Sequence, residues 1–234
     1  MKRILIAGAL ALAAGGQALA ADLPQPAPPP PRAPATYVPV PAPVFTWTGI
    51  YVGINGGYAF GTSSWNEPGF IGGPTGNFST DGFLVGGTLG GNYQWGQFVL
   101  GIEGDGDWTN LNGTTTTACF AGCETKSDWL ATVRCRAGYA FDRVLVYGTG
   151  GAAFGNLQAA YAALPFSSST QTGWTAGGGV EFALTPNLTA KVEYLYVDLG
   201  SQSCAVGNCS NSGNPTSVSL TENVVRAGIN YKFW

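Results

Sequence analysis

Three acidic side chains at alternating positions, Glu103, Asp105 and Asp107, are the densest group of potentially reactive residues in this chain. Carboxylates at this spacing could bind calcium or act as an acid–base pair. However, the glycine that a calcium-binding loop needs at its sixth position is replaced by Trp108. In a strand, alternation places all three carboxylates in a row on one face. We therefore interpret them as ion-pair partners and predict no metal site.

Other signatures of catalysis are weak. The chain contains no histidine, which excludes Ser-His-Asp hydrolysis and any other histidine-based catalysis. Gly148-x-Gly150-x-x-Ala153 matches a dinucleotide fingerprint only nominally, because it lies in a predicted strand with no helix after it. The net charge is −3 and no basic stripe alternates with aromatics, so nucleic acid is not an expected partner. We predict no enzyme and no cofactor.

Four of the five cysteines form two close pairs, Cys119 with Cys123 and Cys204 with Cys209. Each pair falls in a predicted polar loop, and disulfides form readily after export, so we expect one bridge within each loop. Free thiols, bridges between the loops and a zinc site made of all four thiolates stay open as alternatives. The fifth, Cys135, occupies a strand position predicted to face lipid.

The N-terminal region has the composition of an export signal followed by a linker. Lys2 and Arg3 precede an apolar run, and small residues at 18–20 form a cleavage site, so residues 1–20 are a predicted signal peptide. The apolar run is shorter than the roughly 20 residues that a membrane-spanning helix needs. Residues 21–46 are rich in proline and predict an extended periplasmic linker. Residues 47–234 then form a single domain.

Composition and alternation in that domain favour β-structure at a membrane. The chain has 36 glycines and only 10% charged residues, whereas a soluble domain has about 25%. At the C-terminus, the strand from Val225 places apolar residues on one face and polar residues on the other, and it ends in aromatics, which is typical of outer-membrane barrels. The predicted assembly signal within it comprises Ile229, Tyr231, Phe233 and Trp234.

Eight alternating segments are recognisable, and their connections alternate between tight turns and long loops. The segments are 47–60, 81–95, 97–109, 129–141, 144–155, 174–184, 188–196 and 225–234, with the facing of 144–155 left open. The tight turns are expected at Gly96, 142–143 and 185–187, and the long polar loops at 61–80, 110–126, 156–170 and 200–221. The fold prediction is an all-β, eight-stranded, antiparallel, up-and-down transmembrane β-barrel with long extracellular loops and both mature termini in the periplasm.

The charged faces of these strands predict the content of the barrel. A basic side chain facing lipid near the bilayer midplane costs about 2 to 4 kcal/mol, so the charges should point inward. Eight strands enclose an interior only just wide enough for side chains, so ion pairs are expected to pack the lumen. The predicted lumen ion-pair residues are Glu103, Asp105, Asp107, Arg134, Arg136, Glu181, Lys191, Glu193, Arg226 and Lys232.

Aromatic residues near the strand ends predict the membrane interfaces. Tryptophan and tyrosine concentrate at the two boundaries between lipid and water. The expected girdle comprises Trp47, Trp95, Trp108, Trp129, Trp174 and Tyr196, whereas Trp65 and Phe78 are expected in a loop.

Several motifs resemble one known family. They lie at 20–24, 47–58, 136–151, 191–200 and 226–233, and include Trp47-Thr-Gly-Ile-Tyr-Val-Gly and Arg226-Ala-Gly-Ile-Asn-Tyr-Lys-Phe233. The chain resembles the RopB-type alphaproteobacterial outer-membrane proteins, described as porin-like with an opacity-type β-barrel. The resemblance implies an envelope protein that the barrel assembly machinery inserts and that contacts membrane lipid, lipopolysaccharide, and peptidoglycan or host surfaces. It implies no catalytic residues.

Two functions follow as hypotheses. The first is a structural outer-membrane barrel that supports envelope integrity and presents surface loops for interaction, with its lumen packed by ion pairs. The alternative is a narrow porin-like channel for ions or small solutes, which needs a continuous wet path through the charges. A soluble ligand-binding barrel is disfavoured because it would reverse the facing, with apolar residues inside.

Overall fold

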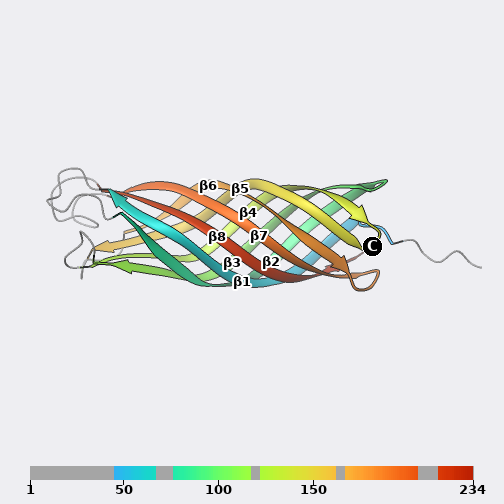
Figure 1. Cartoon of the computed structure of the whole chain (residues 1–234), viewed down its shortest axis with the longest axis horizontal. Helices are drawn as coiled ribbons and strands as arrows, with labels where there is room; N and C mark the ends of the chain where they lie inside the picture. Colours follow the sequence, from blue (N-terminus) through green and yellow to red (C-terminus); the bar gives the residue numbers. More distant parts are fainter. Residues whose placement is uncertain (1–44, 67–75, 117–121, 162–166, 205–215, 234) are drawn as a thin grey trace, which may run out of the picture. The chain divides into compact units, whose positions relative to one another are not determined.

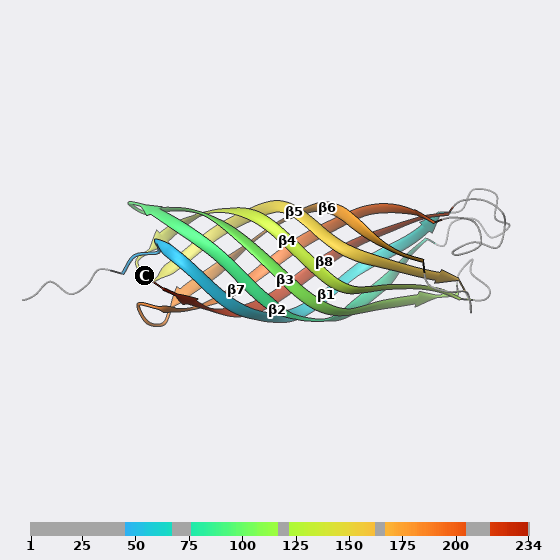
Figure 2. The ribbon, with the colours of Figure 1, turned by 180° about the vertical axis from the view of Figure 1, so that it is seen from behind.

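The computed structural model describes residues 45–66, 76–116, 122–161, 167–204 and 216–233, which form one closed barrel (Figures 1 and 2). Every strand pairs antiparallel with the next, and β1 closes the barrel by pairing with β8. This confirms the predicted eight-stranded, up-and-down architecture. No helix among the described residues is long and apolar enough to cross a bilayer. The strands are β1 (Gly49–Asn66), β2 (Asn77–Trp95), β3 (Phe98–Thr115), β4 (Cys123–Phe141), β5 (Val144–Tyr161), β6 (Ser167–Ala183), β7 (Leu188–Cys204) and β8 (Thr216–Lys232).

Tight turns join the strands at one end of the barrel, which we call the turn end; the opposite end is the loop end. Gly96 and Asp142 have φ values of 63° and 56°, a left-handed conformation that glycine and aspartate tolerate in short turns. Residues 45–48 precede β1 at this end, and Phe233 follows β8 there, where its N–H donates to Ile50 O at 3.0 Å. The structure has tight turns at the three predicted positions, Gly96, 142–143 and 185–187.

The outer surface is apolar between two rings of aromatic side chains. Ile54, Phe83 and Ile102 are 67–70% exposed, so the face away from the lumen is hydrophobic, as the alternation predicts. Aromatic girdles on both sides of an apolar band are typical of a transmembrane barrel. The loop-end ring consists of Tyr58, Phe83, Trp108, Trp129, Trp174 and Tyr196, and the turn-end ring of Tyr93, Trp95, Phe98, Tyr139, Phe141, Tyr231 and Phe233.

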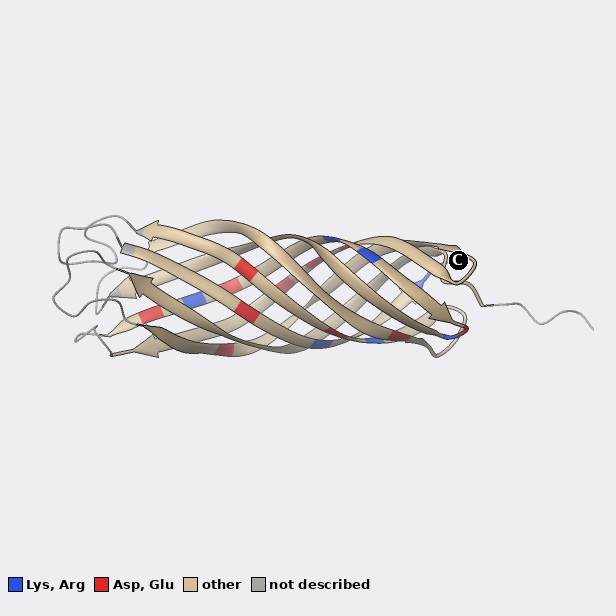
Figure 3. Ribbon diagram, turned by 45° about the horizontal axis from the view of Figure 1, so that its top comes forward, with Lys and Arg blue, Asp and Glu red and all other residues tan. Residues whose placement is uncertain are grey.

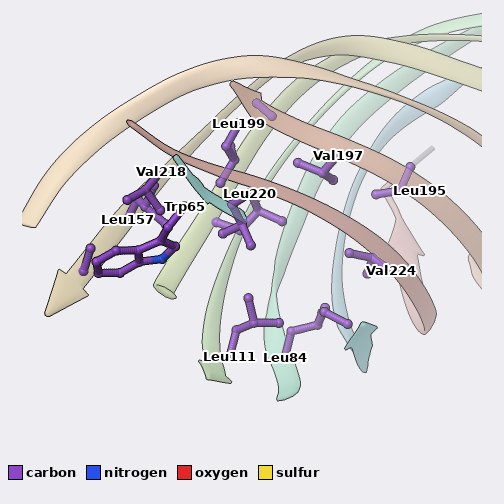
Figure 4. Packing of buried hydrophobic residues seen from close by; sticks show 14 of the residues in the cluster. Trp65, Leu84, Leu111, Leu157, Leu195, Val197, Leu199, Val218, Leu220 and Val224 are labelled. Atoms are coloured by element: carbon purple, nitrogen blue, oxygen red, sulfur yellow. The ribbon is translucent and has the colours of Figure 1, made fainter. Parts of the chain in front are cut away.

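Beyond the loop-end ring the facing reverses, because polar side chains point outward and apolar ones fill the lumen. Outside, Tyr58 OH donates to Asp81 at 2.5 Å and Tyr194 OH donates to Asn223 at 2.6 Å. Inside, the side chains converge (Figure 4). We call this set the loop-end plug: Ala59, Trp65, Leu84, Leu111, Cys123, Leu130, Ala153, Leu157, Ala159, Leu195, Val197, Leu199, Val218, Leu220 and Val224, with Phe78 packed against it.

This reversal corrects the predicted loop boundaries. The long loops were expected to begin near residues 61, 110, 156 and 200, yet β1 continues to Asn66 and β3 to Thr115. Trp65, expected in a loop, is 3% exposed and lies inside the barrel. The prediction was wrong because Ser, Thr and Asn on the outward face resemble loop composition, although alternation continues underneath them.

One charged residue lies within the loop-end plug. Glu222 sits between Leu220 and Val224 on the inner face of β8, is 2% exposed, and its Oε1 has no hydrogen-bond partner among the described residues. A buried polar atom without a partner costs about 1–3 kcal/mol. We expect Glu222→Leu to raise the free energy of unfolding by about that amount, measured by urea denaturation in detergent micelles. Glu222→Gln, which keeps an unpaired polar group, is the control, and a destabilised leucine variant would contradict the prediction.

A second apolar cluster closes the turn end. Trp47 is 2% exposed and packs with Leu145 and Ala183 inside the mouth of the barrel. Its indole Nε1 donates to Asp142 O at 3.1 Å, and its backbone N–H donates to Gln94 Oε1 at 2.7 Å. The prediction that Trp47 belongs to the lipid-facing girdle was therefore wrong. We call the set the turn-end plug: Trp47, Val99, Ala140, Leu145, Tyr147 and Ala183, with Phe45 packed against it.

Candidate functional site

Between the two plugs, the lumen holds a layer of charged side chains. Most of the barrel's lysines and arginines lie in the half nearer the C-terminus, which is the turn end (Figure 3). Their exposure does not exceed 7%, so solvent screens them little. We call the set the charged layer: Glu103, Asp105, Asp107, Arg134, Arg136, Glu181, Lys191, Glu193 and Arg226.

Glu103 is the centre of the turn-end half of this layer. Arg134 Nη2 lies 2.6 Å from its Oε1, and Lys191 Nζ lies 2.9 Å from both of its oxygens. Tyr51 OH donates to Oε2 at 2.7 Å, and Arg136 Nη1 lies 3.4 Å from the same oxygen. Both carboxylate oxygens are therefore fully engaged, which leaves Glu103 no capacity to act as a free base.

Arg226 organises the half nearer the loop end. Its Nη1 donates to Asp105 Oδ1 and lies 3.0 Å from Asp107 Oδ2, and its Nη2 lies 2.7 Å from Glu193 Oε2. Arg134 connects the two halves, because it also contacts Asp105 Oδ2 at 2.9 Å and Glu193 Oε1 at 3.1 Å. One continuous network thus joins β3, β4, β7 and β8 across the lumen.

Arg136 lies nearest the turn-end plug and is held by aromatic rings. Its guanidinium carbon is 3.9 Å from the Tyr147 ring centroid and 5.8 Å from that of Tyr51. Its Nη2 donates to Glu181 Oε2 at 2.7 Å. Stacking on aromatic faces stabilises a desolvated guanidinium, which offsets part of the cost of its buried Nε, an atom with no hydrogen-bond partner among the described residues.

Glycines opposite the charged residues provide the room that this layer needs. Gly101 pairs with Arg136, Gly151 with Arg134, and Gly57 with Arg226. A Cβ added at Gly57 would lie 2.3 Å from Val225 O and 2.7 Å from Arg226 Cα. Glycine at these lumen positions leaves room for the large side chain of the residue that it pairs with on the neighbouring strand. This accounts for part of the chain's high glycine content.

Nine of the ten residues predicted as lumen ion pairs lie together in the charged layer, and Lys232 does not. Its Nζ donates to Thr46 O and lies 4.4 Å from the centroid of the Phe45 ring, at the mouth of the turn end. Among the described residues it has no carboxylate within 4.0 Å. The predicted inward facing of Lys232 agrees with its exposure of 7%, but its predicted ion pair is not found among the described residues, because alternation gives the facing of a side chain and not its depth.

Sequence reasoning missed two buried tyrosines that donate hydrogen bonds to this layer. Tyr51 donates to Glu103, and Tyr147 OH donates to Glu193 Oε1 at 3.0 Å. The signal for Tyr51 was available, since it alternates with the lipid-facing Ile50 and Val52. The glycine-rich segment that contains Tyr147 has too few large side chains for its facing to be assigned from the pattern.

The remaining predicted positions are only partly described. Cys123 is disulfide-bonded, and the side chains of Cys119, Cys204 and Cys209 lie outside the described part of the chain, so the pairing within each loop stays a prediction. Cys135 is a free thiol on the outer surface. In the C-terminal signal, Ile229, Tyr231 and Phe233 are about half exposed on the outer face, and Trp234 lies outside the described residues. No cluster of three or more His, Cys, Asp or Glu in the described part of the chain could hold a metal ion.

Comparison with known proteins gives consistent matches. Residues 33–233 match the family model described as "Outer membrane protein beta-barrel domain". The chain is 38% identical over 209 residues to the 31 kDa outer-membrane immunogenic protein of Brucella melitensis, covering 81% of this chain and 85% of that protein. It is 33% identical over 188 residues to the 22 kDa outer membrane protein of Rhizobium leguminosarum, covering 80% and 79%.

The solved structures that the chain matches include two bacterial surface and outer-membrane proteins. It matches Neisserial surface protein A with a TM-score of 0.44 at 17% identity, covering 80% of this chain and 98% of that one. It matches OprG of Pseudomonas aeruginosa with a TM-score of 0.48 at 14% identity, covering 80% and 96%.

Proposed function

The chain belongs to the outer-membrane β-barrel protein family, and we propose that within it this protein is a sealed structural barrel that supports the envelope and presents extracellular loops. The observation that carries the proposal is the division of the lumen into three packed layers. The turn-end plug, the charged layer and the loop-end plug follow one another along the barrel axis. A solute would have to displace all three.

The charged layer supports a structural role because its carboxylates already have partners. Glu103, Asp105 and Glu193 each contact two or more cationic groups. Separating one charged side chain from such a buried network costs free energy, because it leaves its partners uncompensated. The layer therefore resists the rearrangement that a conducting path needs. The alternative function, a narrow channel for ions or small solutes, requires both apolar plugs to open as well.

The proposal includes an arrangement of the whole chain in the envelope. Residues 1–20 direct export and are removed, residues 21–46 form a periplasmic linker, and residues 47–234 are the barrel domain. The turn end faces the periplasm, so the loops meet the extracellular side and its lipopolysaccharide. Insertion by the barrel assembly machinery, contact with peptidoglycan or a host surface, and the lack of an enzymatic activity or cofactor all belong to this proposal.

The test is single-channel conductance of the refolded protein in a planar lipid bilayer. We expect no conductance steps in the wild type. Trp47→Ala removes the largest side chain of the turn-end plug, yet we expect it to stay silent because the other two layers remain closed. Shifted migration of the unheated protein in gel electrophoresis verifies folding, and a general porin serves as the positive control. Steady conductance of the wild type that rises in proportion to salt would contradict the sealed barrel and establish the channel.

A further inference from the structure

Just beyond the loop-end ring, the outer face of β8, β1 and β2 carries a row of side chains suited to a polar ligand. Asn223 of β8 and Asp81 of β2 pair with Phe60 of β1, one on each side. Phe60 is 45% exposed, and Asp81 is exposed as well. A pocket of about 380 Å³ lies over this row, and we call it the polar pocket. Its lining also includes Tyr58, Thr62 and Ser79.

The polar groups of this pocket have hydrogen-bonding capacity to spare. Among the described residues, Asp81 accepts only from Tyr58 OH, through Oδ2, and no cationic side chain lies within 4.0 Å of it. Asn223 Nδ2 donates one of its two hydrogens to Phe60 O at 3.3 Å, so the other is available. One row nearer the loop end, the exposed Ser79 adds a hydroxyl. The pocket thus presents a carboxylate, an amide and hydroxyls around an exposed aromatic ring.

An apolar groove lies on the same three strands, nearer the turn end. Gly56 precedes Phe60 by four residues on β1, which is about 13 Å along the strand. It pairs with Ala227 of β8 and with Val85 of β2, and these outward-facing residues line a groove of about 800 Å³. We call it the apolar groove. Only the row that contains Tyr58, in the loop-end ring, separates it from the polar pocket. A polar site and an apolar site are therefore aligned across the boundary between water and hydrocarbon.

We propose that the polar pocket and the apolar groove together bind one membrane lipid with an uncharged sugar headgroup. The apolar C–H face of a sugar ring packs on the π-face of Phe60, which carries negative partial charge. The sugar hydroxyls donate to Asp81 and accept from Asn223. The acyl chains extend along the strands into the groove over Gly56, at the depth of the hydrocarbon.

The chemistry of the pocket separates this lipid from those with charged headgroups. Asp81 repels a phosphate, and no cationic side chain within 4.0 Å in the described part of the chain compensates for that repulsion. An ammonium headgroup would engage the carboxylate but leave the amide and the hydroxyls unused. The site lies on the outer surface of the barrel, so it is independent of whether the lumen is sealed.

The test is native mass spectrometry of the barrel refolded in a polyoxyethylene detergent, which contains no sugar. The probe is monoglucosyl dioleoylglycerol. Dioleoyl phosphatidylglycerol and dioleoyl phosphatidylethanolamine have the same acyl chains with charged headgroups. We expect the wild type to bind the glucosyl lipid about tenfold more tightly than either phospholipid, the effect of roughly one hydrogen bond to a charged group.

Two variants, each with a matched control, locate the site. Asp81→Ala removes the carboxylate and should weaken binding of the glucosyl lipid about tenfold, whereas Asp128→Ala, which removes an exposed acid from β4, should not. Ala227→Leu fills the apolar groove and should also weaken binding. Its control is Ala131→Leu, in a separate groove of about 790 Å³ that extends over β2, β3 and β4, and this variant should bind like the wild type.

Three results would overturn the proposal. The first is equal binding of all three lipids by wild-type protein that is folded by gel mobility. The second is tighter binding of phosphatidylethanolamine than of the glucosyl lipid, which would make the pocket an ammonium site. The third is unchanged binding of the glucosyl lipid by folded Asp81→Ala. If Asp81→Ala does not fold, Asn223→Ala takes its place with the same expected loss and the same contrary result.

Discussion

Arg226→Ala is expected to lower the free energy of unfolding by about 3–5 kcal/mol, because removing one member of a buried ion network leaves its partners uncompensated. Arg226 contacts Asp105, Asp107 and Glu193, which lie on two other strands, β3 and β7. All three carboxylates would lose a counter-charge in a place that water does not reach. Urea denaturation of the refolded protein in micelles, followed by tryptophan fluorescence, measures the change.

Arg143→Ala is the matched control for the loss of a positive charge. Arg143 is exposed in the turn between β4 and β5, and among the described residues no ion pair involves its side chain. We expect a change within about 0.5 kcal/mol, as for most surface substitutions. If the two variants were equally stable, the charged layer would contribute little to stability, and the structural role proposed for it would fail.

Gly57→Val is expected to prevent closure of the barrel. Gly57 faces the lumen beside Arg226, and its new Cβ would meet the backbone of β8 at Val225 O and Arg226 Cα, both within 2.7 Å. Backbone atoms of a paired strand cannot move aside without breaking the ladder, and a barrel in lipid cannot leave that edge unpaired. We expect no folded species after dilution into micelles, judged by gel mobility and the circular dichroism of β-structure.

The neighbouring glycine provides a sharp control. Gly56 faces outward, and the nearest atom to its added Cβ is Leu84 O at 3.6 Å, which is an ordinary contact. Gly56→Ala should therefore fold with wild-type yield. Normal folding of Gly57→Val would show that the seam between β1 and β8 tolerates displacement, contrary to the packing described above.

Alternation was sufficient to predict the strands where apolar residues face lipid. In β8, the alternation of Arg226 with Val225 and Ala227 gave both the strand and its inward charge, because lipid and lumen impose opposite preferences. The turns followed from local chemistry at Gly96 and Asp142. Fold, number of strands and direction of the charged faces were therefore predictable from one sequence.

Depth and long-range contacts were not predictable in this way. Trp47 was assigned to the lipid-facing girdle because a tryptophan beside a strand has the same local pattern whether it turns outward or folds into the mouth of the barrel. Lys232 has the correct facing, but among the described residues no carboxylate lies within 4.0 Å of its Nζ. The specific partners of Arg226 depend on contacts across the lumen, which no short-range pattern contains.

The reversal of facing at the loop-end ring fixes how deeply the barrel can sit in the bilayer. If the barrel moved in the direction of its turn end, Asp81 and Asn223 would enter hydrocarbon, where polar side chains are unfavourable. If it moved the opposite way, apolar residues such as Phe83 and Trp108 would emerge into water. Both displacements cost free energy, so the strands themselves fix the depth of the barrel in the bilayer. The loop ends of the strands consequently keep a constant height relative to the lipid headgroups, which the sequence of the strands sets and the sequence of the connecting segments does not.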